Sequence, residues 1–242
     1  MPSPDTRLLK EITVFIPAFN EEQRLRESVE TVIECAQKET IGVDIIVVDD
    51  ASTDRTADVA DDLARQHPCV RVIHHFENKG FGYGFKEAAQ DSRCDRILLF
   101  PGDNCVSTQT LRSMMRNAWE ADFIGANLAN TAVRPLLRRI LSKIHSTIYI
   151  VTFGLPLTQI QVTPVYKVDL LRDMEIRSPR YSFLPEVAVR MIRKGVFFKE
   201  IPGYMNPEAR RSSSALRFRN LADVMRTYLS LVWEIHVQEL LR

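Results

Sequence analysis

The chain has 242 residues, of which 45% are hydrophobic and 26% are charged. This is the composition of a globular protein with enough apolar side chains to form a core. The 32 lysine and arginine residues nearly balance the 31 aspartate and glutamate residues, which gives a net charge of +1. So small a charge gives no indication of a nucleic-acid partner.

The cysteines and the apolar runs indicate the cellular compartment of the protein. Cys35, Cys69, Cys94 and Cys105 form no CxxC pair and have no zinc-site spacing with histidine. The polar N-terminal run contains no signal-peptide core, and the longest apolar run, 148–157, is about half as long as a membrane span. We therefore expect a cytoplasmic protein that can attach peripherally to the inner face of the membrane.

Over the first 125 residues, strand patterns alternate with helix patterns. Short apolar or β-branched runs predict strands, and apolar residues three and four apart predict helices. This alternation predicts an α/β fold with a mostly parallel sheet flanked by helices, whose ligands bind at the carboxyl ends of the strands. The expected strands are 12–16, 44–48, 70–74, 96–100 and 123–125, and the expected helices are 25–35, 53–66, 85–90 and 107–119.

The second half of the chain is less regular. We expect a basic amphipathic helix at 133–152, a strand at 162–168, a helix at 184–194, a strand at 196–201 and a long helix at 216–241 with an apolar stripe. The charge is uneven here, because 123–168 contains no aspartate or glutamate and 201–222 contains Glu208 alone. The surplus of basic residues indicates an anionic partner, although solvated helix faces would give the same pattern.

Polar clusters directly follow the first two predicted strands. The first is 17–22 (PAFNEE), and the second begins with Asp49 and Asp50 and continues to Ser52 and Thr53. Either cluster could be a turn with a helix cap. However, two carboxylates at the end of a buried strand are costly unless they are solvated or bound to a base N–H, a ribose hydroxyl or a metal. The second cluster therefore favours contact with a nucleotide.

Two more clusters follow the next two strands. The spacing of the glycines in 78–84 (NKGFGYG) does not fit a dinucleotide fingerprint. It indicates a flexible helix start where the backbone can approach a ligand and Lys79 can bind a diphosphate. Gly102 and Asp103 then place a lone carboxylate on a glycine turn, which could also be an Asx turn.

In order and spacing, the four clusters resemble those of the family-2 glycosyltransferases with the GT-A fold, above all the dolichol- and polyprenyl-phosphate sugar synthases. The family's P-x-(Y/F)-N-E matches 17–21, its V-D-D-x-S-x-D matches 48–54, and its N-x-G matches the start of 78–84. Further along, 183–186 resembles F-x-x-E, 199–202 resembles x-E-(I/V)-P, and 210–214 resembles the R-x-x-G-x-S-K loop. The resemblance covers residues 11 to 220.

The sequence departs from this family at three places. Pro101 replaces the first aspartate of the D-x-D metal motif, and Cys105 replaces a polar residue two positions after Asp103. A thiol is an unusual ligand for a hard cation. The segment 159–164 (QIQVTP) stands where the family has D-x-x-(S/T)-G-F-(R/K). These departures concern the metal and the acceptor and leave the donor motifs intact.

The resemblance implies one Rossmann-like GT-A domain over 1–242, with C-terminal amphipathic helices. The nucleotide-sugar-binding half would span 11–125, the acceptor-binding half 126–220 and the C-terminal helix 216–242. The donor would be a GDP- or UDP-linked sugar. Its implied binding residues are Pro17, Ala18, Phe19, Asn20, Glu21, Asp49, Asp50, Ser52, Lys79, Gly80, Gly102 and Asp103.

The resemblance also implies inverting hexosyl transfer to an acceptor, above all a polyprenyl phosphate. Asp103 would hold a divalent cation, Mg²⁺ or Mn²⁺, with Cys105 as a weak second ligand, and stabilise the leaving diphosphate. A phosphate acceptor needs no general base, whereas a hydroxyl needs one, and Glu186 is the first candidate for it. A carboxylate that merely begins a helix would look the same. The implied acceptor-binding residues are Arg134, Arg138, Arg139, Ser142, Arg210 and Arg211.

Three other functions fit parts of the sequence. The chain could transfer a sugar to a soluble hydroxyl acceptor, or it could be a non-catalytic subunit that binds a nucleotide-sugar, since Pro101 removes one metal-motif aspartate. A nucleotidyltransferase shares a similar fold, but it usually opens with a glycine-rich basic loop after the first strand. The segment 17–22 lacks such a loop.

Overall fold

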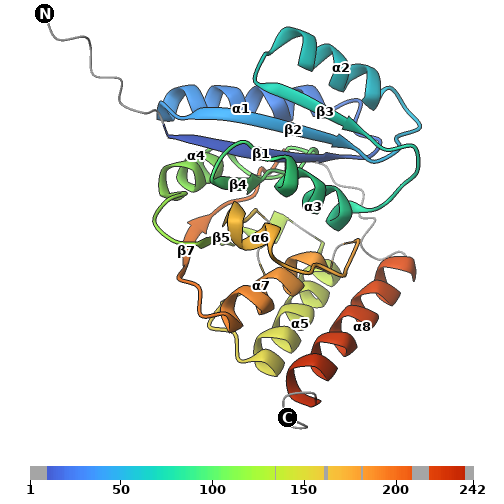
Figure 1. Ribbon diagram of the computed structural model, residues 1–242, viewed down its shortest axis with the longest axis vertical. Coiled ribbons are helices and arrows are strands. Elements are labelled where there is room, and N and C mark those ends of the chain that lie inside the picture. The colour runs from blue at the N-terminus through green and yellow to red at the C-terminus, as the bar shows by residue number, and fades with distance from the viewer. Residues whose placement is uncertain (1–9, 134, 161–162, 181, 209–217, 238–242) are drawn as a thin grey trace, which may run out of the picture.

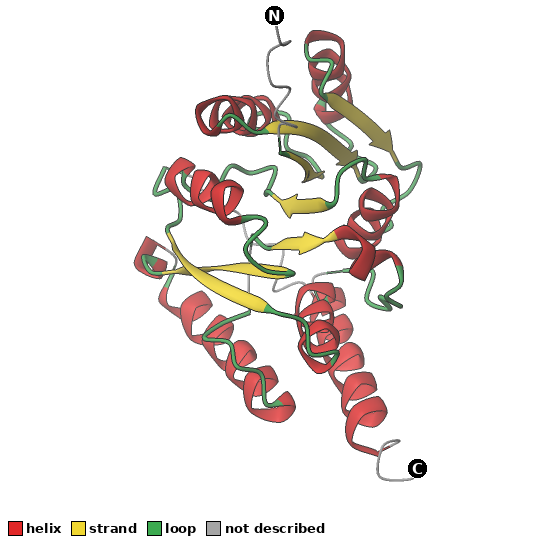
Figure 2. Cartoon of the chain, turned by 60° about the vertical axis from the view of Figure 1, so that its left-hand side comes forward, coloured by secondary structure: helices red, strands yellow, loops and turns green. Residues whose placement is uncertain are grey.

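The computed structural model describes residues 10–133, 135–160, 163–180, 182–208 and 218–237 (Figures 1 and 2). Within these residues, strands and helices alternate through the first half of the chain. The strands are β1 (Glu11–Ala18), β2 (Gly42–Asp49), β3 (Val70–His74), β4 (Arg96–Leu99), β5 (Phe123–Leu128), β6 (Val165–Lys167) and β7 (Phe198–Gly203). The helices of this half are α1 (Leu25–Glu39), α2 (Thr56–Gln66), α3 (Phe81–Asp91) and α4 (Thr108–Asn117).

The described strands form one sheet in the order β3-β2-β1-β4-β6-β5-β7. The pairs β1–β2, β2–β3, β1–β4 and β5–β7 are parallel, whereas β6 runs antiparallel to both β4 and β5. The run Ile45–Val48 in β2 is buried throughout, as expected for a strand covered on both faces. The predicted mostly parallel α/β sheet is therefore confirmed.

Each face of the sheet carries its own apolar core. On one face, alternate residues of β1 such as Val14 and Ile16 pack with α1, α2 and α4. On the other face, Phe15 of β1 packs with α3 and with the helices of the second half (Figure 1). This alternation follows from the two-residue period of a strand, which sends successive side chains to opposite faces. The loops that follow β1, β2 and β4 lie at the carboxyl ends of these strands, at the edge of the sheet between the two cores.

The second half adds α5 (Leu136–Phe153), α6 (Val168–Arg172), α7 (Phe183–Arg193) and α8 (Phe218–Val232), with a 3₁₀ turn at Thr131–Val133 and a π-helical turn at Trp233–Val237. The α5 and α8 helices lie at one end of the molecule (Figures 1 and 2). They are in contact there, because the Thr152 and Tyr228 hydroxyls lie 2.9 Å apart and the Tyr149 and Tyr228 rings meet edge to face. No described helix combines the length and the hydropathy needed to cross a bilayer.

The element boundaries differ from the sequence-based expectations at several helices. The α3 helix begins at Phe81, four residues before the expected start at 85, because the glycine-rich segment is helical. The α5 helix begins at Leu136, after Pro135, and ends at Phe153, where Gly154 caps it with a left-handed φ of 62°. The five-residue α6 helix was not expected, since so short a helix leaves no periodic pattern.

Candidate functional site

The loops after β1 and β2 are joined into one surface. The Asn20 N–H donates to Ser52 Oγ at 3.0 Å, and the Thr53 N–H donates to Asn20 Oδ1 at 2.8 Å. The Glu21 N–H donates to Thr56 Oγ1 at 2.8 Å. The predicted donor residues of the first cluster are thus brought against those of the second. The exposed ring of Phe19 stands at the edge of this surface.

Asp49 lies at the end of β2 and borders an open cleft. Its side chain is 5% exposed, and Oδ1 accepts the Ser52 N–H at 3.1 Å. Its Oδ2 lies 3.2 Å from Nδ1 of His74, which is its register partner on β3. The cleft beside Asp49 is lined by Ala51, Ser52, Thr53, Ala57, Asp61, His74, His75 and Phe76. Asp49 and Ser52 can therefore reach a ligand that enters from this side.

Asp50 binds the turn before α3. Its Oδ1 accepts the Lys79 N–H at 2.8 Å, and its Oδ2 accepts the Gly80 N–H at 2.9 Å. The Asn78 side-chain amide donates to the Asp50 carbonyl at 3.1 Å. The structure therefore brings together the predicted donor residues Asp50, Lys79 and Gly80. In this arrangement Asp50 positions the loop, while the Lys79 ammonium lies 4.6 Å from the Tyr83 ring centroid.

Two adjacent histidines bridge carboxylates at this edge of the sheet. His74 lies between Asp49 and Asp61, and His75 lies between Asp50 and Glu87. Burial alone would lower the pKa of His74, but its hydrogen bonds with Asp61 and Asp49 outweigh burial and raise that pKa above its usual value. The raised pKa favours a positive charge beside Asp49.

The loop after β4 carries Gly102 and Asp103. The Ser28 hydroxyl of α1 donates to the Gly102 carbonyl at 2.7 Å, which ties this loop to the helix that follows the first cluster. Asp103 is half-buried, and its Oδ1 accepts the Cys105 N–H at 3.3 Å. The Cys105 side chain is fully buried in the apolar core that contains α1 and α4. Asp103 thus stays on the half-buried loop after β4, whereas the predicted weak ligand Cys105 packs in the core beneath it.

The loop after β4 offers few protein ligands for a metal ion. Within the described part of the chain, no three histidine, cysteine, aspartate or glutamate side chains are grouped so that they could hold a metal ion. Mg²⁺ and Mn²⁺ take several oxygen ligands. Asp103 offers one carboxylate, and Pro101 offers none. A divalent cation here would need oxygens supplied by its substrate.

Glu186 lies at the start of α7 and is 1% exposed. Its Oε2 accepts the backbone N–H of Ser178 at 2.8 Å, and both of its oxygens accept the backbone N–H of Arg177 at 3.1 Å. The Arg190 guanidinium donates to Oε1 at 3.1 Å. These donors occupy the carboxylate, which favours a role in holding the segment 175–180 rather than in removing a proton. The role of Glu186 as a base stays a prediction.

The predicted acceptor-binding residues are only partly described. Arg138 is half-buried and Arg139 and Ser142 are exposed, all in the first two turns of α5. Arg138, Ser142 and Ser146 are four residues apart, so they share one helix face. Ser146 is buried, and its Oγ accepts the Ile160 N–H at 3.3 Å. The face therefore turns toward the protein at Ser146 and is open to solvent at Ser142. Arg134, Arg210 and Arg211 lie outside the described residues.

The family model named glycosyl transferase family 2 matches residues 13–162, which contain the loops after β1, β2, β3 and β4. The chain belongs to glycosyl transferase family 2. It is therefore a glycosyltransferase with the GT-A fold, as the order of its polar clusters predicted.

Individual family-2 relatives differ in how much of their length is matched. The undecaprenyl-phosphate mannosyltransferase of Micrococcus luteus is 27% identical over 206 residues, which are 79% of this chain and 82% of the relative. A dolichyl-phosphate beta-glucosyltransferase of Drosophila melanogaster is 28% identical over 150 residues, which are 54% of this chain and 46% of the relative. The chain thus spans less than half of the dolichyl-phosphate enzyme.

Solved structures share the family-2 fold. Glucosyl-3-phosphoglycerate synthase of Mycobacterium tuberculosis, crystallised with Mg²⁺ and uridine diphosphate, has a TM-score of 0.67 at 16% identity, over 91% of this chain and 79% of that chain. TarS of S. aureus has a TM-score of 0.60 at 15% identity, over 94% and 75% of the two chains. At these identities the likeness extends to the fold alone.

Sequence reasoning missed several residues that contact the candidate site or the segments beside it. The sequence analysis did not single out His74 and His75. The available signal is that these two histidines lie at the end of a strand, 25 positions after two adjacent aspartates. The missed segment 177–180 and its partner Asp223 leave no such signal, because their contacts come from helices far along the chain.

Proposed function

We propose that this glycosyltransferase moves a sugar from a GDP- or UDP-linked donor to a polyprenyl phosphate at a membrane surface. The observation that carries the acceptor class is the outward face of α5, which is apolar although it is exposed. The donor class rests on the joined loops after β1, β2 and β4. We further propose that the product is inverted at the anomeric carbon, as the family resemblance implies.

The loops at the carboxyl ends of the strands would hold the nucleoside diphosphate. Asp49 and Ser52 border the open cleft, and their side chains offer acceptors for a base N–H or a ribose hydroxyl. Lys79, on the loop after β3, would bind the diphosphate directly, and Asp103, on the loop after β4, would bind it through a divalent cation. In parallel α/β sheets this edge is where ligands bind.

The outward face of α5 is suited to a lipid surface. Large apolar side chains occupy it over about four turns, and each is between 39% and 74% exposed. A helix with one apolar face and flanking cationic residues can rest in the headgroup region of a bilayer. Arg139 and Lys143 are exposed on the same helix. The apolar residues are Leu136, Leu137, Ile140, Leu141, Ile144, Ile148 and Val151.

The inward face of α5 would receive the acceptor phosphate. Arg138 and Ser142 share this face with the buried Ser146, so a phosphate that they bind would lie on the protein side of the helix. A guanidinium can bind phosphate oxygens in a bidentate manner. The helix would thus present the lipid on its outer face and the phosphate on its inner face.

A phosphate acceptor agrees with the surroundings of Glu186. A phosphate monoester is already ionised near neutral pH, so its oxygen can attack the anomeric carbon without losing a proton to the enzyme. The new bond joins that oxygen to the anomeric carbon, and the bond to the nucleoside diphosphate breaks. A hydroxyl acceptor would need a general base. Glu186 has its oxygens engaged by Arg177, Ser178 and Arg190 and is poorly placed for that task.

The leaving diphosphate needs positive charge close to it. Glucosyl-3-phosphoglycerate synthase of M. tuberculosis was crystallised with Mn²⁺ or Mg²⁺ together with uridine diphosphate. In this chain, Asp103 would be the protein ligand of such an ion and the diphosphate would supply further oxygens. The ion would add charge at the leaving group, and the residues of the chain would bind the nucleoside and orient the acceptor.

The test is a transfer assay with short-chain polyprenyl phosphate and a panel of UDP- and GDP-sugars, with Mg²⁺, with Mn²⁺ and with EDTA. We expect a sugar-phospholipid product from one donor. The variant Arg138→Ala with Arg139→Ala should raise the lipid KM or abolish transfer while donor binding persists. Lys38→Ala with Arg93→Ala removes the same charge from exposed sites on other elements and is the matched control.

Two outcomes would contradict the proposal. Transfer to soluble sugars with none to the lipid would replace the acceptor class and make Glu186 the leading candidate for the base. Equal losses in the two double variants would show that general surface charge, rather than Arg138 and Arg139, governs use of the lipid.

A further inference from the structure

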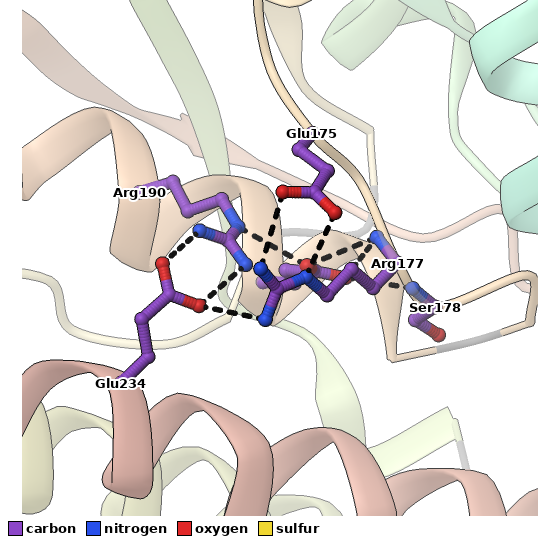
Figure 3. A network of polar contacts seen from close by, with 6 residues as sticks. Glu175, Arg177, Ser178, Arg190 and Glu234 are labelled. Atoms are coloured by element: carbon purple, nitrogen blue, oxygen red, sulfur yellow. Dashed lines mark hydrogen bonds and ion pairs between the residues drawn. The ribbon is translucent and has the colours of Figure 1, made fainter. Parts of the chain in front are cut away.

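The segment 175–180 between α6 and α7 is held on the side of α7 by an ion-pair network. Arg190 donates to Glu234 of the π-helical turn at 2.7 Å, and Arg177 donates to Glu234 at 3.1 Å and to Glu175 (Figure 3). The hydrogen bond from Arg190 holds the pKa of Glu234 below its usual value. Together with Glu186, this network fixes the backbone at Arg177 and Ser178.

The α8 helix holds the same segment from a second side. The Ser178 hydroxyl donates to Asp223 of α8 at 3.0 Å, and the Ser182 N–H donates to the same carboxylate at 3.4 Å. The Ser178 oxygen also lies 3.4 Å from the Arg180 N–H, which donates to it. The chain is therefore held at Ser178 and at Ser182 by a half-buried carboxylate of α8.

The far side of the segment rests on the donor loop. The Pro179 carbonyl accepts the N–H groups of Gly82 at 2.9 Å and of Tyr83 at 3.2 Å, at the start of α3. The approach to Gly80 is so close that a Cβ there would lie 2.3 Å from the Pro179 oxygen and 3.2 Å from Cγ of Arg180. Gly80 also has a φ of 99°, which other residues rarely adopt. Arg180 is thus packed on a residue of the predicted donor site.

We propose that Arg180 is a donor-binding residue whose guanidinium, next to Lys79, contacts the diphosphate of the nucleotide-sugar. This assignment rests on the proposed donor class. Unlike Arg177 and Arg190, Arg180 has no ion pair with a carboxylate among the described residues. A half-buried arginine that is held by a built scaffold but is not used in an ion pair is available for an anionic ligand.

The chemistry of the leaving group explains why a second cation is useful beside Lys79. Pro101 leaves Asp103 as the one carboxylate of the metal motif, so fixed cations gain importance for the leaving group. Lys79 supplies a point charge, whereas arginine can bind two phosphate oxygens at once. Both come from segments that Asp50 and Glu186 hold in place, and these segments meet where Pro179 and Arg180 pack on Gly80.

The test measures nucleotide binding, which requires no acceptor. UDP and GDP are titrated by calorimetry into the full-length protein and into three variants, in EDTA and in Mg²⁺. We expect Arg180→Ala to weaken binding of the preferred diphosphate about tenfold, the usual scale of a charge-assisted contact, and more in EDTA than in Mg²⁺. Arg180→Lys should recover part of the loss. Arg177→Ala removes an ion-paired arginine from the same segment and should change affinity less than about threefold.

The outcomes separate this assignment from the proposed function. Wild-type binding with an unchanged affinity in Arg180→Ala overturns the role of Arg180 and leaves the donor class standing. An equal loss in Arg177→Ala, with a lowered Tm in both variants, would also overturn it, because the segment would then act as structural support alone. Absence of UDP and GDP binding by the wild-type protein would overturn the donor class, and Arg180 with it.

Discussion

The Nδ1 atom of His75 lies 2.7 Å from Oδ1 of Asp50, the oxygen that also accepts the Lys79 N–H. On its other side the same ring lies 2.7 Å from Glu87 of α3. His75 therefore links the end of β2 to the body of α3, while Asp50 links it to the start of that helix. One imidazole and one carboxylate fix the turn that carries Lys79 and Gly80.

Replacing His75 with alanine should destabilise the protein by about 1–3 kcal/mol, because two carboxylates would lose a buried partner. The preferred nucleoside diphosphate should also bind more weakly, since Asp50 would no longer be fixed. Urea unfolding and calorimetry measure the two effects. His67→Ala, at the end of α2, should stay within about 0.5 kcal/mol of the wild type. If the two variants were equally stable, the bridge would have no energetic role.

Replacing Glu186 with glutamine separates support from catalysis. A positioning role predicts a loss of about 1–3 kcal/mol in stability and less than about tenfold in transfer, because the amide keeps the shape but loses the charge beside Arg190. A general base would cost about a hundredfold or more. Asp103→Asn, measured in the same assay, should show the larger loss. A fall in kcat of that size for Glu186→Gln, with an unchanged urea midpoint, would favour the base.

The fold was largely predictable because periodicity reports burial. The run 44–48 indicated a strand covered on both faces, and β2 has that environment. The contact between the first two polar clusters was predictable for a related reason. Loops that follow neighbouring parallel strands must meet at one edge, so Asn20 and Ser52 were expected near each other and lie 3.0 Å apart from backbone nitrogen to hydroxyl.

The partner of each polar side chain was not predictable, because periodicity says nothing about contacts between distant segments. Glu186 begins a helix, as a dipole argument allows, but its carboxylate binds the segment eight residues earlier. The Ser178 hydroxyl donates to Asp223, which lies 45 residues later in the chain. Residue spacing does not predict a contact between segments so far apart. Cys105 follows the metal motif in sequence, yet its side chain turns into the core.

His74 should make stability depend on pH in a defined direction. Its pKa in the folded protein is raised above 6.5 by Asp61 and Asp49, against the effect of burial. A raised pKa adds stability that is fully present below the ordinary pKa and is lost as the pH rises through the folded value. The Tm difference between wild type and His74→Asn should therefore be larger near about pH 5.5 than near about pH 9. A difference that grows with pH would reverse the assignment.

The outward face of α5 should govern binding to lipid. Ile144 and Ile148 are about half exposed and lie one turn apart on that face. Changing both to glutamate should reduce binding to vesicles of phosphatidylcholine and phosphatidylglycerol by about tenfold or more, because two apolar side chains would leave the headgroup region and two charges would repel the anionic lipid. Cosedimentation measures the bound fraction, and wild-type binding should also weaken as salt rises.

The control for this variant must carry the same change in net charge. Gln90→Glu with Gln109→Glu adds two negative charges at exposed positions of α3 and α4. If it released the protein from vesicles as strongly as the α5 variant, the attraction would be one of overall charge, and the apolar face would have another use. If it binds like the wild type while the α5 variant does not, the loss belongs to the helix face. Transfer to polyprenyl phosphate presented in the same vesicles should then fall with binding, whereas affinity for the nucleotide should not change, because α5 lies apart from the loops that follow β1 and β2 (Figure 1).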